Sequence, residues 1–476
     1  MAPNKAPLWQ QLKTFVARAP VSFHVPGHKN GQILPHSDWE AFQSLLTYDV
    51  TELPDLDDLH HPTGVIKEAE ELARRFFRAN ETYFLVNGST VGNLVMILST
   101  VKRGDTILVQ KNCHKSVINA IELSQATPVF VSPQYDHQRQ RYTHPPFATI
   151  KKVIEEENIK AIFLTYPDYY GTVYDLKKII DYVHQHDVIV LVDEAHGVHF
   201  SIEDARIPAS SLHLGADLVV QSAHKMAPAL TMSAYLHVGS MRIETSRVRH
   251  YLQMLQSSSP SYLLMASLDL ARYFLQELSS RQLTAVLESI EQVRTILAEL
   301  DGTELVAPST SVDPFKLTLV VEPGYDTKQI NDLLISHGIY IEMMTPHVLL
   351  FVHGLSYFNE MNRLKEAMKD INLKLKNIAK HDTIDNNKAI KTKPLTRLCY
   401  TYQAMLEMET MRVALNECEG YVAAEAIVPY PPGIPLILKG ESIDALAKAA
   451  VEQMVLEKRY IQNDITEGIL VFKGAN

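Results

Sequence analysis

Short apolar runs alternate with amphipathic stretches along the chain from about residue 83 onward. The runs are YFLV (83–86), TILVQ (106–110), VFV (129–131), AIFLTY (161–166), VIVLVD (188–193), DLVVQS (217–222) and SAYLHV (233–238). Runs of this kind, rich in Val, Ile and Phe, are typical of strands buried on both faces. The segments between them, such as VGNLVMILSTVKRG and DLKKIIDYVHQH, carry apolar residues at helical spacing. The pattern predicts an α/β fold with a mainly parallel sheet wrapped by helices.

The second half of the chain predicts smaller parts. Residues 261–300 favour two helices, and the region after them favours strands FKLTLVV (315–321) and IYIEM (339–343) with a closing helix near 357–379. The polar stretch 380–394 ends in proline and is the best linker candidate. Further helices are expected near 396–410 and 443–460. We therefore expect an N-terminal arm (1–40), a large domain (41–300), a small α/β domain (301–380) and a C-terminal domain (381–476).

Composition excludes several classes of protein. Of the 476 residues, 46% are hydrophobic and 21% are charged, as in ordinary soluble globular proteins. The formal net charge of −10 opposes nucleic acid or a membrane as a partner and favours a small cation. No signal peptide or long apolar run is present, so we expect a cytoplasmic protein. The three cysteines are far apart and have no metal-site spacing, so no metal is expected.

A hydroxyl-rich turn follows the first apolar run. Asn87-Gly88-Ser89-Thr90 lies between YFLV and a predicted helix. Gly88 allows a tight turn, and Ser89 and Thr90 place hydroxyl and backbone N–H groups at a helix start, where a phosphate can bind. Helix capping by Ser89 or Thr90 is the simpler alternative.

Two later strand ends carry an acid and an amine. Asp193 ends VIVLVD, and Ser222-Ala223-His224-Lys225 follows DLVVQ. Each has an ordinary explanation, since a strand-end Asp often caps the next element and most lysines are surface charges. Their order changes the interpretation, because a phosphate anchor, an acid for a pyridine nitrogen and an amine for an aldehyde are what pyridoxal phosphate requires. His114, after TILVQ, could stack on the pyridine ring or be a buried structural histidine.

With these residues the sequence resembles the pyridoxal-phosphate-dependent ornithine/lysine/arginine decarboxylases, which have the aminotransferase-like fold (fold type I). The matching segments are FHVPGHKNG (23–31), ELPDLDDLHHPTGVIKEAE (52–70), FLVNGSTVGN (84–93), KNCHKS (111–116), VDEAHGVHF (192–200), SAHKMAPALTMSAYLHV (222–238) and PYPPGIPLILKGE (429–441). They occur in family order over nearly the whole chain. Only about twenty residues precede the PGHK segment, whereas longer members have a receiver-like domain there, so we do not expect their ring-shaped assemblies.

The resemblance implies a role for each matching residue. Lys225 resembles the lysine that forms the Schiff base, Asp193 the partner of the pyridine nitrogen, and His114 the histidine stacked on the ring. The remaining matches are Ser89, Thr90 and Ser222 to the phosphate, His224 beside the reacting centre, and His196 near the ring where longer members often have an aromatic residue. Ser257 aligns with a hydroxyl residue that reaches the phosphate of a neighbouring subunit, which implies a homodimer or higher homo-oligomer with the active site at the subunit interface.

The implied reaction is decarboxylation of arginine, lysine or ornithine. Lys225 or His224 would return a proton to the α-carbon. The cationic end of the substrate requires an acid, and the candidates are Glu441, Asp57 and Asp58. Two alternatives stay open: an aminotransferase of the same fold, which usually needs an arginine for the α-carboxylate, and a non-catalytic homologue that binds a polyamine or a partner protein. The sequence does not separate the three substrates.

Overall fold

The computed structural model describes residues 5–33, 40–136, 139, 141–377, 393–429, 435–456 and 460–474. Most of the expected linker, 380–394, lies outside the described residues. The chain divides into two compact units. Unit 1 contains residues 1–100, 175–184 and 189–281, and unit 2 contains residues 101–174, 185–188 and 282–476.

Unit 1 is built on four strands in the order β1-β9-β8-β7. The strands are β1 (Glu81–Leu85), β7 (Ile189–Asp193), β8 (Leu218–Ser222) and β9 (Ala234–Val238). The helices are α1 (Pro7–Ala17), α2 (Glu40–Leu46), α3 (Val65–Phe77), α4 (Gly88–Thr100), α7 (Leu176–His184), α8 (Ser211–Leu214), α9 (Ala223–Met226), α10 (Thr245–Leu255) and α11 (Tyr262–Glu277), with a 3-10 turn η2 (Val198–Ser201). Every residue of β8 and β9 is buried, as expected for strands covered on both faces.

The direction of β9 differs from a purely parallel arrangement. β7 and β8 are parallel, but β9 pairs antiparallel with both β8 and β1. The connection from β8 to β9 consists of residues 223–233 only. A parallel return needs a crossover of about a dozen residues or more, so this short connection returns the chain antiparallel.

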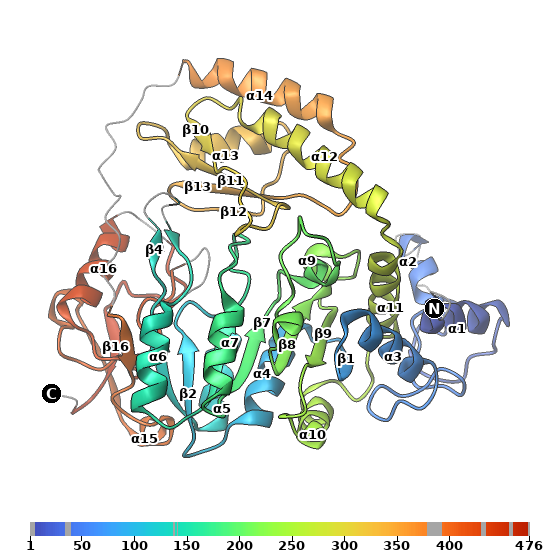
Figure 1. The fold of residues 1–476 in the computed structure, drawn as a ribbon, viewed down its shortest axis with the longest axis horizontal. Helices are drawn as coiled ribbons and strands as arrows, with labels where there is room; N and C mark the ends of the chain where they lie inside the picture. Colours follow the sequence, from blue (N-terminus) through green and yellow to red (C-terminus); the bar gives the residue numbers. More distant parts are fainter. Residues whose placement is uncertain are drawn as a thin grey trace. The chain divides into compact units, whose positions relative to one another are not determined.

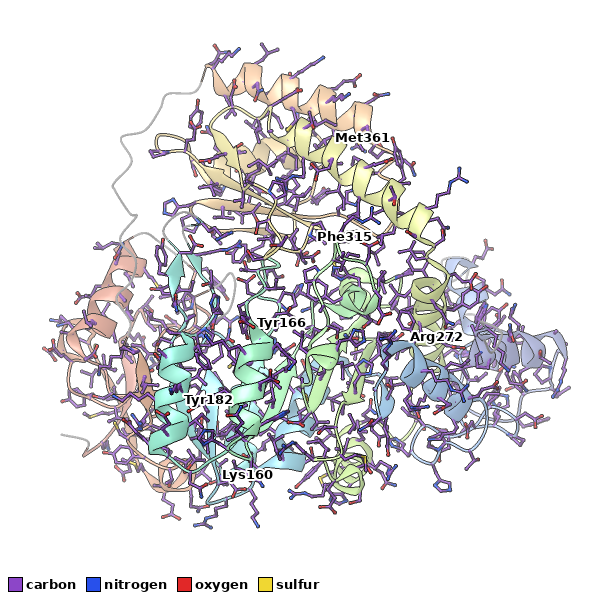
Figure 2. All side chains as sticks on the ribbon, in the orientation of Figure 1. Lys160, Tyr166, Tyr182, Arg272, Phe315 and Met361 are labelled. Carbon is purple, nitrogen blue, oxygen red and sulfur yellow. The ribbon has the colours of Figure 1, made fainter. Side chains whose placement is uncertain are left out.

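The N-terminal helix of unit 1 is held by a buried ion pair on α11. The carboxylate of Asp269 accepts hydrogen bonds from the backbone N–H of Leu8 (3.0 Å) and from Nη2 of Arg272 (2.8 Å). Arg272, labelled in Figure 2, is fully buried and also donates to the carbonyl of Lys5. The pair therefore fixes the start of α1 against α11.

Unit 2 contains three main sheets. One has the strands β6-β2-β3-β14, in which β2 is parallel to β3 and β6, and β14 is antiparallel to β3. A four-stranded sheet has the order β10-β11-β13-β12, and β15 pairs with β16. The strands are β2 (Thr106–Gln110), β3 (Thr127–Val131), β4 (Tyr135–Asp136), β5 (Arg141–Tyr142), β6 (Ile159–Thr165), β10 (Thr303–Leu305), β11 (Lys316–Val321), β12 (Met343–Met344), β13 (Val348–Val352), β14 (Leu395–Arg397), β15 (Thr410–Val413) and β16 (Ile469–Phe472).

The helices of unit 2 also bury apolar residues at helical spacing. They are α5 (Lys115–Ser124), α6 (Phe147–Glu156), α12 (Ser280–Leu297), α13 (Thr327–Ser336), α14 (Met361–Leu375), α15 (Tyr402–Glu407) and α16 (Ala445–Leu456), with a 3-10 turn η3 (Leu415–Glu417). Figure 1 shows α12 and α14 on one side of the four-stranded sheet. A separate apolar cluster forms the core of the C-terminal part, around Ile427, Ile437 and Val471.

Two expected elements of unit 2 are wrong. The predicted strand 339–343 is a strand only from Met343, and Tyr340 is 79% exposed. The buried position beside β11 is taken instead by β13, which the sequence analysis did not identify. The expected helix 396–410 is reduced to α15, because residues 395–397 pair with β3 and the hydroxyl of Thr401 caps a helix that starts at Tyr402.

Candidate active site

Three strands of unit 1 end at the same edge. β1 is antiparallel to β9, β9 is antiparallel to β8, and β8 is parallel to β7, so β1, β7 and β8 run in one direction. The carboxyl ends of such strands are where α/β folds bind ligands. Ser89, Asp193, Ser222 and Lys225 all lie at or directly after these ends.

Two predicted phosphate ligands are in direct contact. The hydroxyl of Ser89 lies 2.6 Å from the hydroxyl of Ser222, and both side chains are buried. Ser89 is in the first turn of α4, where the chain enters the helix through Gly88 at φ 73°. Thr90 follows at an exposed position. The site therefore gathers hydroxyl groups and helix-start N–H groups, which together suit a phosphate.

Gly92 allows α4 to approach β8 closely enough for this contact. A Cβ atom at Gly92 would lie 2.4 Å from Cγ2 of Val220 and 2.9 Å from Cδ1 of Leu85. These distances are too short for any side chain at position 92. Because Gly92 has no side chain, α4 can lie close to β8, and Ser89 can contact Ser222.

Asp193 is held by neutral donors. It is the last residue of β7 and is 4% exposed. One carboxylate oxygen accepts from Nδ2 of Asn93 (2.9 Å), and the other accepts from the backbone N–H of Ala195 (3.0 Å). Two neutral donors orient the carboxylate without neutralising its charge, so it can still pair with a protonated ring nitrogen.

Lys225 reaches the turn that follows Asp193. Its Nζ lies 3.0 Å from Nε2 of His196, which is 7% exposed. The amine and the acid thus lie at the ends of two neighbouring parallel strands, and the amine contacts the turn that begins at the acid. This contact gives His196 a partner in the site, and its role near the ring stays a prediction.

His224 is half-buried beside Lys225. Its Nδ1 lies 3.2 Å from the carbonyl of Ser233, which assigns the Nδ1 atom as the N–H donor. Burial lowers the pKa of His224, so the ring is neutral at neutral pH. Nε2 is then the ring atom that can accept a proton.

The other predicted residues of unit 1 have local partners. The hydroxyl of Ser257 is exposed and donates to the carbonyl of Ser259 (3.2 Å). The carboxylate of Asp57 accepts backbone N–H bonds from Gly64 (2.8 Å) and Ile66 (3.0 Å) at the start of α3. Asp58 accepts from the backbone N–H of His60 (2.8 Å). The contacts of Asp57 are those of a helix cap.

His114 and Glu441 belong to unit 2. His114 is exposed and caps α5, because its Nδ1 accepts from the backbone N–H of Ser116 (3.3 Å). Both carboxylate oxygens of Glu441 accept from Nζ of Lys111, at 2.9 and 3.0 Å, and one also accepts from the N–H of Leu438. These contacts favour a structural role for Glu441, and the substrate role expected of Glu441, Asp57 or Asp58 stays a prediction.

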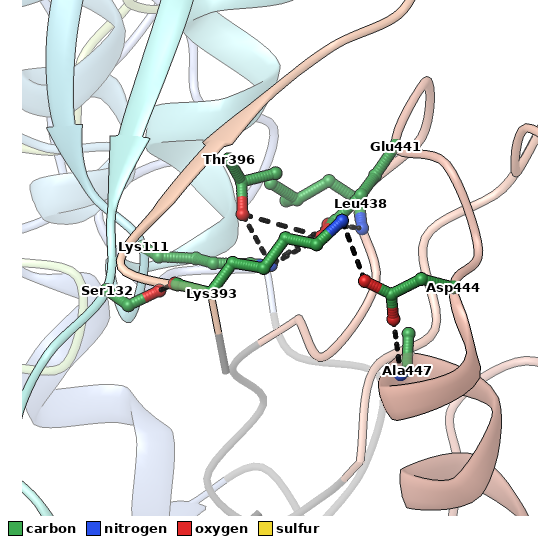
Figure 3. A network of polar contacts seen from close by, with 8 residues as sticks. All are labelled: Lys111, Ser132, Lys393, Thr396, Leu438, Glu441, Asp444 and Ala447. Carbon is green, nitrogen blue, oxygen red and sulfur yellow. Dashed lines mark hydrogen bonds and ion pairs between the residues drawn. The ribbon is translucent and has the colours of Figure 1, made fainter. Parts of the chain in front are cut away.

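Figure 3 shows this buried ion pair with its neighbours. Nζ of Lys111 also donates to Thr396 (3.3 Å), and both charged side chains are about nine-tenths buried. A second pair, Lys393 with Asp444 (2.7 Å), lies beside it. Lys111 directly follows β2, so the C-terminal part of unit 2 is bonded to the strand that precedes His114.

Sequence reasoning missed two groups that hold the site. Asn93 lies four residues after Ser89 on α4, and that spacing places both polar side chains on one face of a helix whose middle is apolar. Glu194, directly after Asp193, is fully buried. A carboxylate inside a segment that is buried throughout must have hydrogen-bond donors, and that was the available signal for Glu194.

Comparison with known proteins shows which family the chain resembles over most of its length. The model of the Orn/Lys/Arg decarboxylase major domain matches residues 6–312, and that of the C-terminal domain matches residues 386–463. The uncharacterized protein YaaO of Bacillus subtilis is 42% identical over 465 residues, 96% of each chain. An arginine decarboxylase of the same organism is 33% identical over 458 residues, 93% of this chain and 92% of that protein.

A solved structure shows the same fold. The constitutive lysine decarboxylase of E. coli superposes with a TM-score of 0.81 at 20% identity, over 98% of this chain and 82% of that one. No helix in the described part of this chain has the length and apolar character needed to cross a membrane.

Proposed function

Because the chain belongs to the Orn/Lys/Arg decarboxylase family, we propose that it is a pyridoxal-phosphate-dependent decarboxylase whose substrate is arginine. The observation that carries the proposal is the contact of Lys225 with His196, on the turn that begins at Asp193. This contact places the amine of Lys225 at the sheet edge where the acid Asp193 lies. Arginine is favoured among the basic amino acids because relatives named arginine decarboxylase are 31–33% identical, whereas those named lysine decarboxylase are 24–25% identical.

The residues of unit 1 fit the cofactor. Ser89, Thr90 and Ser222 would hold the phosphate with the first N–H groups of α4, and the paired hydroxyls of Ser89 and Ser222 suit it because each can donate. Asp193 would hold the proton on the ring nitrogen. Pyridoxal phosphate, when bound, supplies an electron sink for the carbon–carbon bond that breaks.

Three side chains would hold or move a proton: Asp193, Lys225 and His224. Asn93 and the N–H of Ala195 keep the carboxylate of Asp193 in one orientation. Lys225 would provide the amine, and His196 would keep its Nζ at the turn. Lys225 or Nε2 of His224 would hold the proton that replaces the departing carboxylate.

We also propose that copies of this chain associate. The N-terminal segment of unit 1 exposes large apolar side chains, including Val21 (84%), Phe23 (92%) and Val25 (63%). A run of this kind is the usual mark of a protein interface. A second copy covering it would allow Ser257, whose hydroxyl is exposed, to serve the phosphate of its neighbour.

A product assay tests the proposed function. The full chain, loaded with pyridoxal phosphate, is incubated with arginine, lysine or ornithine, with and without a keto acid. We expect carbon dioxide and agmatine from arginine, and we expect Lys225→Ala to abolish both. Lys328→Ala is the control, because this exposed lysine pairs with a surface acid, Asp332. Substantial turnover by Lys225→Ala would overturn the assignment.

The same assay separates the alternatives. Cadaverine or putrescine without agmatine would overturn the choice of arginine while keeping the reaction. Amino transfer to the keto acid without carbon dioxide would show an aminotransferase. Binding of the amino acid without either product would show a non-catalytic homologue.

A further inference from the structure

We propose that Glu194 is the positioning residue of the active site: its carboxylate fixes the turn 193–197 and so places Asp193 and His196 against Lys225. It would act through the turn, by its bonds to Ser210, Ser211 and Gln221. The inference deepens the proposed function and rests on it for the roles of Asp193 and Lys225. The contacts of Glu194 itself are independent of that function.

Four donors converge on the carboxylate of Glu194. One oxygen accepts from Oγ of Ser210 (2.9 Å) and Nε2 of Gln221 (2.7 Å). The other accepts from the backbone N–H of Ser211 (2.6 Å) and from its hydroxyl. The donors come from the start of α8 and from β8, so one side chain joins the turn to two other elements.

The backbone of the turn is fixed at the same residue. The N–H of Glu194 donates to the carbonyl of Val220 on β8 (2.9 Å), and its carbonyl accepts from the N–H of Gly197 (2.9 Å). A Cβ at Gly197 would lie 2.6 Å from Cγ of Glu194. The turn is therefore closed tightly over the side chain of Glu194. Asp193 is the first residue of this turn, and His196 lies within it.

The donors are themselves ordered by a chain of hydrogen bonds across the sheet. Oε1 of Gln221 lies 3.1 Å from Nε2 of His237 on β9, and Nδ1 of His237 lies 2.9 Å from the hydroxyl of Thr82 on β1. Burial lowers the pKa of His237 to about 3, so the ring is neutral and carries one N–H. If Thr82 donates to Nδ1, then Nε2 donates to Gln221 and the amide N–H of Gln221 points at Glu194.

This arrangement explains how a carboxylate can stay inside unit 1. Burial raises the pKa of Glu194 to about 7, while the bonds from Ser211, Gln221 and Ser210 oppose that rise. A buried charge without donors would be strongly unfavourable, whereas aligned dipoles can replace the lost water. The same donors that stabilise Glu194 also fix its position, and with it the position of the turn.

The experiment measures Lys225 directly. In the full-length protein freed of pyridoxal phosphate, whose aldehyde would block the amine, an amine reagent labels Lys225 over a range of pH. Mass spectrometry of the peptide gives the midpoint, the pH at which labelling is half-complete. We expect Glu194→Ala to shift that midpoint by at least about half a pH unit, because His196 no longer lies beside Nζ. We also expect the affinity for pyridoxal phosphate to fall about tenfold or more in this variant. Glu194→Gln keeps the shape, but its NH2 group must face either Nε2 of Gln221 or the backbone N–H of Ser211, and both are donors. We therefore expect a shift and a loss of affinity that are smaller than in Glu194→Ala.

Controls separate positioning from general loss of stability. Asp269→Asn removes another buried carboxylate of unit 1 and should lower the melting temperature without moving the Lys225 midpoint. If Glu194→Ala does not fold, Ser211→Ala removes one donor and should give a smaller shift in the same direction. A Lys225 midpoint unchanged in both variants would overturn the inference. A shifted midpoint in a protein that releases no carbon dioxide would support the positioning role and refute the proposed function.

Discussion

Glu70 and Glu194 are both buried carboxylates of unit 1, but their partners differ. Glu70, on α3, accepts a hydrogen bond from the backbone N–H of Phe84 (3.0 Å), whereas Glu194 accepts from four donors. Burial raises the pKa of Glu70 to about 8 and that of Glu194 to about 7. At neutral pH Glu70 is therefore mainly protonated, and Glu194 is close to its midpoint.

The raised pKa of Glu70 predicts a pH-dependent stability. In the unfolded chain a glutamate has a pKa near 4.5, so the folded state binds the proton more tightly. The stabilisation is complete below about pH 4.5 and is lost as the pH rises through about 8, at up to about 1.4 kcal/mol per pH unit. Glu70→Gln should remove this slope.

Chemical denaturation of both proteins between pH 5 and pH 8 checks the prediction. The wild-type protein should lose unfolding free energy relative to Glu70→Gln as the pH rises. A difference that is constant over this range would show that Glu70 is ionised in the folded state.

At the scale of elements, α4 is the helix that assembles the site. It starts in the phosphate turn, carries Asn93 to Asp193 and crosses β8 at Gly92. One helix thus connects the ends of β1, β7 and β8. A shift of α4 relative to β8 would alter the phosphate site and the carboxylate of Asp193 together.

Gly92→Ala tests this arrangement. The added methyl group would overlap Val220 and Leu85, and such overpacking lowers stability by about 1–3 kcal/mol. Because the helix must move, the affinity for pyridoxal phosphate should fall as well. Adding Val220→Ala makes room for the methyl group and should restore part of the affinity, which equilibrium binding would measure. Equal affinities of wild type and Gly92→Ala would show that α4 does not need this close approach.

The sequence predicted the residues at strand ends better than it predicted their partners. Lys225, Asp193 and Ser89 could be selected because each follows a buried apolar run. The spacing of Asn93 from Ser89 places it on the same helix face, but its bond to Asp193, like that of Gln221 to Glu194, depends on which strands and helices are neighbours. The antiparallel direction of β9 and the replacement of strand 339–343 by β13 were missed for the same reason: pairing is decided by the rest of the fold.

For the whole molecule, the exposed N-terminal apolar segment and Ser257 lead to a joint prediction. If copies associate through this segment, Phe23→Ser should weaken association, as measured by sedimentation. Ser257→Ala should leave association intact but reduce the affinity for pyridoxal phosphate, because its hydroxyl would serve the neighbouring subunit. Ser309→Ala, at another exposed serine, is a control for the second variant. A monomeric wild-type protein with full activity would contradict both expectations.

The ion pair of Lys111 with Glu441 limits which C-terminal domains of related proteins can replace the one in this chain. A fragment ending at residue 377 would keep Lys111 and lack both Glu441 and Thr396. Removing one partner of a buried pair costs about 3–5 kcal/mol, since the remaining charge has lost its water as well as its counter-ion. Chimeras that exchange the C-terminal domain should therefore fold well only when the donor supplies an acid opposite Lys111, so the two regions are expected to be inherited as a matched set.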